Sequence, residues 1–136
     1  MEKIVLTIGT FDLLHVGHLE LFRYGNQLGS LRVGINSDEF VLGYKGRRPV
    51  QDFIIRAYNV KSYGNTHFIY KNETAGFDLI DEVKPDVLLI GMDWHERDYF
   101  SQIGVTAQYF NDNNIVMVYA PRTTGVSTST LRGANV

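Results

Sequence analysis

The chain has no cysteine, only three prolines and a single tryptophan among 136 residues. The absence of cysteine excludes disulfide bonds, thiol nucleophiles and thiolate metal sites. With so few prolines and no Gly- or Ser-rich tract, nothing indicates a linker, so residues 1–136 are predicted to form one domain. No apolar run approaches the roughly 20 residues of a membrane span, and the apolar start is too short for a signal peptide. We therefore expect a cytoplasmic protein without a membrane partner.

A large excess of either charge is also missing, because 13 Lys and Arg face 15 Asp and Glu, for a net charge of −2. No broad basic face for nucleic acid is predicted from such a balance. The densest positive charge is the short segment Lys45-Gly46-Arg47-Arg48. Any anion-binding site should therefore be local. The hydrophobic content of 44% is that of an ordinary globular domain.

Apolar runs alternate along the chain with segments of helical periodicity. Strands are predicted at residues 4–8, 31–36, 66–70, 87–91 and 115–119. Helices are predicted after each of the first four strands. One runs from about residue 15 to 28. Two follow the second strand, the first from residue 38 after a Ser37 cap and the next across about 50–63. A short helix is predicted at 77–83, and one or two more within 97–113. Such alternation predicts an α/β fold, a three-layer sandwich with a parallel five-stranded sheet. Ligands of such sheets bind beyond the carboxyl ends of the strands.

The segment Gly9-Thr10-Phe11-Asp12-Leu13-Leu14-His15-Val16-Gly17-His18 follows the first predicted strand. Residues three apart share a helix face, so His15 and His18 can approach one ligand, and Gly17 lets that ligand come close to the backbone. Free N–H groups at a helix start suit phosphate. The alternatives are two polar residues at an exposed helix start, or half of a zinc site. Zinc is disfavoured because it needs three or four ligands, and His67 and His95 are not evidently placed to help.

Three further segments carry candidate chemistry. The Lys45 loop could clamp phosphates or simply be solvated. Gly91-Met92-Asp93-Trp94 follows a strand, although Asp93 could be a cap and Trp94 plain packing. In the segment from Arg122 to Ser129, hydroxyls and N–H groups precede a last short helix, and Arg122 can bind phosphate with two hydrogen bonds. An ordinary helix cap is the alternative there. All but the Lys45 loop directly follow predicted strands, so they should meet at one edge of the sheet.

Together, these motifs resemble the HxGH nucleotidyltransferases, and most closely the glycerol-3-phosphate cytidylyltransferase family. The segment 9–18 matches closely, and Arg122-Thr123-Thr124-Gly125-Val126-Ser127-Thr128-Ser129 is similar to the family's second motif, with Thr124 replacing Glu. Met92 replaces an Asp of the family's Gly-Asp-Asp-Trp. The resemblance extends from residue 4 to 130. It implies a Rossmann-like fold, transfer of CMP from CTP to a small phosphorylated alcohol with release of pyrophosphate, Mg²⁺ bound through the nucleotide phosphates, and a homodimer.

The resemblance also implies roles for individual residues. Those expected to be catalytic are His15, His18, Lys45 and Arg122. Those expected to bind the nucleotide are Gly9, Thr10, Phe11, His15, Gly17, His18, Arg47, Gly91, Asp93, Trp94, Arg122, Thr123, Gly125, Val126, Ser127, Thr128 and Ser129. Lys45 and Asp12 are expected to face the substrate, and no residue is expected to ligate a metal directly. Arg56 falls on the family's helix arginine, where a structural role is equally open.

Two alternatives to a cytidylyltransferase stay open. One is an adenylyltransferase of the same fold that uses ATP, and the other is a nucleotide-binding module without catalysis. The acceptor is also open, because the basic residues with which the family holds its acceptor phosphate fall on Gly64 and Gly76 here. Lys61 or Lys71 could replace them. We therefore predict an acceptor other than glycerol 3-phosphate.

Overall fold

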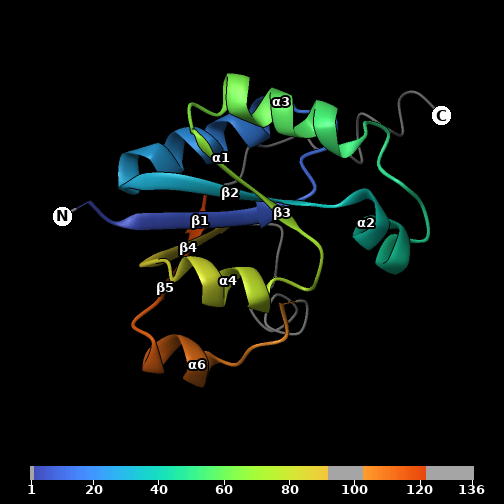
Figure 1. Cartoon of the computed structure of the whole chain (residues 1–136). Coiled ribbons are helices and arrows are strands. Elements are labelled where there is room, and N and C mark those ends of the chain that lie inside the picture. Colours follow the sequence, from blue (N-terminus) through green and yellow to red (C-terminus); the bar gives the residue numbers. More distant parts are fainter. Residues whose placement is uncertain (1, 92–102, 122–136) are drawn as a thin grey trace.

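The computed structural model describes residues 2–91 and 103–121. Its centre is a five-stranded sheet with the order β3-β2-β1-β4-β5, in which every pairing is parallel (Figure 1). The strands are β1 (Ile4–Gly9), β2 (Ser30–Asn36), β3 (Phe68–Asn72), β4 (Val87–Gly91) and β5 (Val116–Ala120). The predicted parallel five-stranded sheet is thus confirmed.

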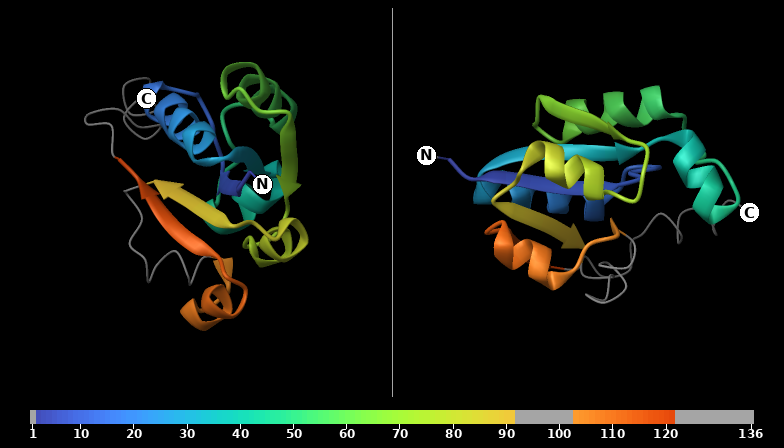
Figure 2. Two further views of the ribbon diagram at one scale, coloured as in Figure 1. Left: turned by 90° about the vertical axis from the view of Figure 1, so that its left-hand side faces the viewer. Right: turned by 60° about the horizontal axis from the view of Figure 1, so that its bottom comes forward.

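Helices cover both faces of the sheet, which makes three layers (Figure 2). One face carries α1 (Val16–Leu28) and α3 (Phe53–Tyr63), and the other carries α4 (Phe77–Val83) and α6 (Ala107–Asp112). Each face has its own apolar core: Leu6, Leu88 and Ile90 pack on the α4 side, and Val5, Val33 and Leu89 on the α1 side. Adjacent residues of one strand thus enter opposite cores, which explains the uninterrupted apolar run of β4.

The remaining helix, α2 (Asp38–Lys45), stands beyond the carboxyl ends of the strands (Figure 1). It begins where predicted, because the Ser37 side chain accepts a hydrogen bond from the Phe40 N–H (3.1 Å). It also runs further than predicted. Lys45, expected in a loop, is its last residue, and the helix ends at Gly46, whose φ of 78° is readily adopted by glycine.

Two boundaries differ from the sequence prediction because polar side-chain contacts override periodicity. Helix α3 starts at Phe53 rather than near residue 50, since Asp52 caps it by accepting from the Ile55 N–H (3.0 Å). Strand β3 starts at Phe68 rather than at 66, since the Thr66 hydroxyl donates to the Leu31 carbonyl (2.6 Å) and accepts from the Phe68 N–H (3.2 Å). Within residues 2–91 and 103–121, no helix is long and apolar enough to cross a bilayer.

Strand β1 lies at the centre of the sheet. The chain continues from it to β2 and β3 on one side and then crosses to β4 and β5 on the other, so the strand order reverses between β1 and β4. Strand β1 pairs with β2 over six positions, from Ile4↔Ser30 to Gly9↔Ile35, but with β4 only at Val5↔Val87 and Leu6↔Leu88. The carboxyl-terminal parts of β1 and β4 are therefore unpaired with each other. A ligand site of this fold is expected at this edge.

Candidate active site

His15 and His18 lie together where α1 begins, at the carboxyl end of β1. Their rings stack with centroids 3.8 Å apart and an angle of 23° between planes. His15 is the N-cap residue, and its Nδ1 accepts from the Gly17 N–H (3.1 Å), while the His15 N–H donates to Nδ1 of His18 (3.3 Å). The two side chains thus cap the helix reciprocally. The prediction that they share one face is confirmed.

These hydrogen bonds define the tautomer of both imidazoles. A ring nitrogen that accepts a backbone N–H carries no hydrogen, so neutral His15 and His18 must each carry theirs on Nε2. Both histidines can therefore donate Nε2–H to one ligand. The Val16 N–H has no acceptor among the described residues, whereas the His18 N–H also faces the His15 side chain in the capping box. Ring and backbone donors at a helix start together suit phosphate oxygens.

Burial keeps this pair neutral at physiological pH. It lowers the pKa of His18 from 6.5 to about 4; the neighbouring His15 lowers this pKa further, and the Asp12 charge opposes both. Burial also lowers the pKa of His15. The edge of the Phe11 ring against His18 (centroids 5.6 Å apart) accounts for part of that burial. A bound phosphate would favour the charged form of both imidazoles.

The loop between β1 and α1 holds an unusual backbone conformation. Phe11 and Leu13 both have a φ of 54°, in the left-handed region that non-glycine residues rarely adopt. Three long-range hydrogen bonds hold it: the Asp12 carboxylate accepts from the N–H groups of Val50 (2.7 Å) and Gln51 (2.9 Å), and the Leu13 N–H donates to the Gln51 side chain (3.1 Å). Such strain persists only where the surroundings enforce it.

Asp12 was expected to face the substrate. Here the residue is 2% exposed, and both carboxylate oxygens accept hydrogen bonds from backbone N–H groups of the segment after the basic loop. These bonds give it an anchoring role, whereas a contact with substrate stays a prediction. The Asp12 anchor fixes one end of residues 46–49 directly to the loop that leads into the histidine pair.

Arg56, in α3, forms the most buried polar network described. Its side chain is 0% exposed and pairs with Asp38 (2.6 Å). Its nitrogens also donate to the carbonyls of Gln51 (2.9 Å), Thr10 (2.7 Å) and Asn36 (2.8 Å). The contacts of Arg56 therefore support a structural role for this residue. One guanidinium ties together the loop after β1, the end of β2, the start of α2 and the start of α3.

The basic loop reaches neither histidine in the described structure. Lys45 Nζ lies 5.7 Å from the centroid of the Tyr44 ring, and within the described part of the chain no contact joins Lys45 or Arg47 to His15 or His18. Arg48 forms only a loose, exposed ion pair with Glu39 (3.8 Å). Lys45 and Arg47 are exposed near the carboxyl edge of the sheet, and their contacts with phosphate stay predictions.

The other expected site residues fall into two groups. Gly9 ends β1, Gly17 lies in the first turn of α1, and Gly91 ends β4, so all three lie at the carboxyl edge. A side chain at Gly9 would meet the Phe11 ring at 2.9 Å, which explains the glycine there. Outside the described residues lie Asp93, Trp94, Arg122, Thr123, Gly125, Val126, Ser127, Thr128 and Ser129.

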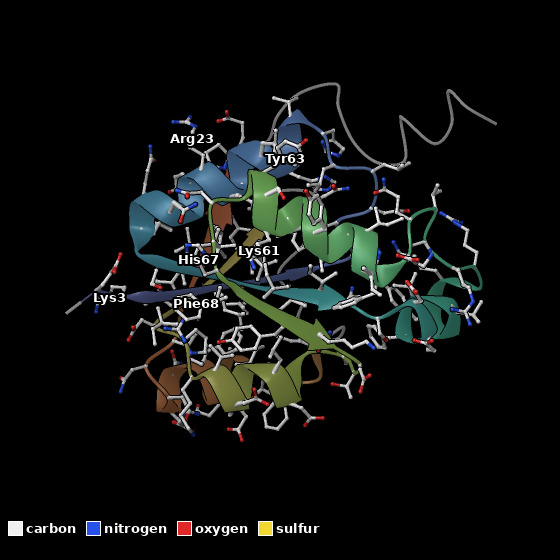
Figure 3. The ribbon with its side chains drawn as sticks, turned by 45° about the horizontal axis from the view of Figure 1, so that its top comes forward. Lys3, Arg23, Lys61, Tyr63, His67 and Phe68 are labelled. Carbon is white, nitrogen blue, oxygen red and sulfur yellow. The ribbon has the colours of Figure 1, made fainter. Side chains whose placement is uncertain are left out.

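The two positions linked to the acceptor phosphate lie at opposite ends of the sheet. Gly64 follows the last turn of α3, near the amino-terminal strand ends, where Figure 3 places Lys61 on the side of His67 and Lys3. Within one chain, Lys61 is therefore far from the histidine pair. Gly76 precedes α4 at the carboxyl edge, with a φ of 119° and Ile103 3.2 Å from where a Cβ would lie. A lysine there would be strained.

Lys71, at the end of β3, is the substitute on the correct edge of the sheet. Its Nζ lies 3.8 Å from the Glu73 carboxylate and 5.1 Å from the centroid of the Phe53 ring. Among the described residues, no three His, Cys, Asp or Glu side chains gather to hold a metal ion. Binding of Mg²⁺ mainly through nucleotide phosphates and water, which the hydration preference of this ion favours, stays a prediction.

Sequence reasoning missed three residues that organise the site: Gln51, Asn36 and Asn72. The buried Asn72 amide donates to the Asn36 side chain (2.9 Å) and to the Thr74 carbonyl (2.8 Å), and Asn36 donates to the Thr10 hydroxyl (3.3 Å). The only signal in the sequence was that β2 and β3 each end on asparagine, which suggests polar contacts at the carboxyl edge.

Fold, switch point and neutral histidine pair together define a member of the nucleotidyltransferase superfamily. Within it, the chain belongs to the cytidylyltransferase-like family, whose pattern matches residues 6–134. The bifunctional protein HldE of Nitratiruptor is 38% identical over 101 residues, covering 71% of this chain and 22% of that protein. HldE of Helicobacter pylori is 37% identical over 100 residues, with the same coverage. The chain thus spans about a fifth of the length of these relatives.

Solved structures support the fold independently. A lipopolysaccharide core biosynthesis protein from Thermoplasma volcanium superposes with a TM-score of 0.72 at 23% identity, over 90% of this chain and 99% of that one. A pantothenate synthetase from Thermus thermophilus gives a TM-score of 0.60 at 16% identity, over 98% of this chain and 65% of that one. At these identities, the likeness concerns the fold alone.

Proposed function

We propose that the chain transfers a nucleotidyl group from a nucleoside triphosphate to a small phosphorylated alcohol or sugar, releasing pyrophosphate. The observation that carries the proposal is the stacked, neutral His15–His18 pair, whose Nε2–H groups have no acceptor among the described residues and lie at the start of a helix. A site of fixed donors suits a reaction in which the protein positions two phosphates and stabilises charge.

In the proposed reaction, a phosphate oxygen of the acceptor attacks the α-phosphorus in line. The new P–O bond forms as the bond to pyrophosphate breaks, and the electron pair leaves with pyrophosphate. His15 and His18 donate to oxygens on which negative charge grows, and Lys45 assists from the last turn of α2. Arg122, Ser127 and Thr128 hold the outer phosphates. Mg²⁺ bound through the nucleotide phosphates would neutralise part of their charge.

CTP is the first candidate for the nucleotide, because the segment from Arg122 to Ser129 resembles the cytidylyltransferase motif and the matching family is described as cytidylyltransferase-like. ATP is the second candidate. The relatives at 35–38% identity are named bifunctional protein HldE, a name that describes no cytidylyl transfer. They leave the choice of base open.

The acceptor should differ from glycerol 3-phosphate. Gly76 is held to glycine by its φ of 119° and by Ile103, and Gly64 lies at the far edge of the sheet. We also propose that the active unit is a homodimer, in which a partner chain would supply any basic side chain missing at the acceptor phosphate. Charge-assisted hydrogen bonds contribute about 1.5–3 kcal/mol each, so losing two should weaken glycerol 3-phosphate strongly.

The test is release of pyrophosphate by the purified protein with Mg²⁺ and each of CTP, ATP, GTP and UTP, across a panel of sugar 1-phosphates and small phosphorylated alcohols. We expect turnover with one nucleotide and an acceptor other than glycerol 3-phosphate. Glycerol 3-phosphate emerging as the best acceptor at micromolar KM would contradict the acceptor proposal. Nucleotide binding without pyrophosphate release from any acceptor would support the non-catalytic module instead.

A further inference from the structure

The hydroxyl of Thr10 occupies a defined position in the polar network of the site. Thr10 follows β1 directly, in the loop that leads to His15, and its Oγ1 lies 3.3 Å from Nδ2 of Asn36. Asn36 ends β2 and is 7% exposed; behind it, Asn72 ends β3 and is 2% exposed. Three side chains from three segments thus form one chain of hydrogen bonds along the carboxyl edge of the sheet.

The direction of this chain is fixed by a backbone carbonyl. The Thr74 carbonyl oxygen can only accept, so the Asn72 atom 2.8 Å from it must be the amide nitrogen. The same nitrogen lies 2.9 Å from a terminal side-chain atom of Asn36, which must therefore be the oxygen. The other terminal atom of Asn36 is then the nitrogen, and it faces Thr10. Asn36 donates, and the Thr10 oxygen accepts.

It follows that Thr10 does not direct its own hydroxyl hydrogen at Asn36. Within residues 2–91 and 103–121, no acceptor for that hydrogen is found. The Thr10 hydroxyl is half-buried and lies at the edge where His15 and His18 offer their Nε2–H groups. A hydroxyl held in this way is preset as a donor, which suits an anionic oxygen.

We infer that Asn36 is a positioning residue that orients the Thr10 hydroxyl as a hydrogen-bond donor to a substrate phosphate, and that Asn72 fixes the orientation of Asn36. This inference rests on the proposed nucleotidyl transfer. It assigns to two buried asparagines a role that their distance from the histidine motif in sequence would not suggest. Neither needs to touch the substrate, because both act through Thr10.

A double-mutant cycle separates this role from a merely structural one. The values of kcat/KM for pyrophosphate release are measured, with CTP and with ATP, for wild type, Thr10→Val, Asn36→Ala and the double variant. Each single change should lower kcat/KM about tenfold or more, as expected for one hydrogen bond to a charged group. In the Thr10→Val background, Asn36→Ala should have little further effect. Losses that multiply fully would overturn the inference.

Asn36→Asp provides a second cycle should Asn36→Ala fold poorly. It keeps the shape and the acceptor for Asn72, but replaces the donor facing Thr10 by an acceptor. Any effect of the added charge is common to both backgrounds, so the loss should be about tenfold smaller with Thr10→Val than with Thr10. Equal losses would count against positioning through Thr10. Thr10→Ser, which keeps the hydroxyl, should retain most activity.

Thr66→Val is the matched control. Thr66 likewise has a hydrogen-bonded hydroxyl, but it is buried and lies at the amino-terminal edge of the sheet. It should lower the melting temperature and leave kcat/KM unchanged; an equal loss of kcat/KM would reduce the effect at Asn36 to stability alone. A wild-type protein that releases no pyrophosphate with either nucleotide would overturn the proposed function, and this inference with it.

Discussion

At the scale of single residues, His15 and His18 combine two tasks. Each accepts a backbone N–H at Nδ1, which caps α1, and each offers Nε2–H to a ligand. Because the cap uses one nitrogen and the ligand the other, structural and chemical contributions can be separated by substitution.

His18→Gln should fold normally and lose activity. Glutamine at the third position of a helix can still accept the N-cap N–H, so the cap is kept while the imidazole donor is lost. Loss of one preorganised donor typically costs ~10²–10³ in rate. His18→Ala should show the same rate loss and an additional loss of about 1 kcal/mol in stability. Single-turnover kinetics and urea unfolding measure the two effects, and near wild-type turnover in His18→Gln would argue against the phosphate-binding role.

The depressed pKa of His18 makes stability depend on pH. Between its ordinary pKa of 6.5 and the folded value of about 4, the unfolded chain binds a proton that the folded chain excludes. Stability should therefore be fully present above pH 6.5 and fall as the pH approaches 4. At one pKa unit per roughly 1.4 kcal/mol, the fall is at most about 3 kcal/mol. Urea unfolding of wild type and His18→Gln from pH 7 to 4 tests this, because the variant should lack this part of the decline.

Arg56→Ala should be among the most destabilising single changes. It leaves the Asp38 carboxylate and three carbonyl oxygens without their buried donor. Breaking a buried ion pair in this way costs about 3–5 kcal/mol. Arg23→Ala is the control, because the Arg23–Glu20 pair is exposed (65% and 45%) and should contribute no measurable stability. Equal melting temperatures for the two variants would contradict the anchoring role of Arg56.

At the scale of elements, the site lies where several segments are pinned to the same edge of the sheet. The Asp12 carboxylate holds the start of α3 to the loop before α1, and Arg56 holds α2 to the same loop. The basic loop between α2 and α3 is thus anchored at both ends, while its own side chains are exposed. Such an arrangement places Lys45 and Arg47 near a ligand without prior contacts.

Substitution by alanine should change stability in opposite directions at two glycines, Gly29 at the end of a helix and Gly43 inside one. At Gly29, between α1 and β2, a Cβ would lie 2.3 Å from the Lys3 carbonyl oxygen, so Gly29→Ala must shift backbone. We expect a loss of about 1–3 kcal/mol, as for overpacked sites. At Gly43, inside α2, a Cβ meets nothing within 4 Å, so Gly43→Ala should add about 0.5–1 kcal/mol through helix propensity. Thermal unfolding should show melting temperatures that move in opposite directions.

At the scale of the whole molecule, a ligand that binds only the folded chain raises its melting temperature. We expect CTP with Mg²⁺ to raise it more than ATP, GTP or UTP. At 100 times its Kd, the gain is about 2.7 kcal/mol. A larger shift with ATP would make adenylyl transfer the better assignment. His18→Gln should reduce the shift, whereas Arg23→Ala should leave it unchanged.

Much of the fold followed from local sequence patterns. Each apolar run and each helical period is contained in a few neighbouring residues, so the order of strands and helices, the parallel sheet and the edge that bears the site could be predicted. The histidine motif belongs to the same class, because both rings lie within four residues of one helix start. The error at the start of α3 was local too, because Asp52 caps that helix from three residues before Ile55. The start of β3 instead depends on the bond from Thr66 to Leu31, which lies 35 positions away.

Tertiary structure alone decided how the site is held. The bonds from Arg56 to Thr10, from Asp12 to Val50 and from Asn72 to Asn36 join residues 46, 38 and 36 positions apart. No periodicity records such contacts, because they depend on which strand ends lie side by side. Periodicity likewise could not show that Gly64 and Gly76 lie at opposite ends of the sheet. Sequence determined which groups could serve chemistry at the first helix start; only the packed sheet decided which buried polar groups fix them in place.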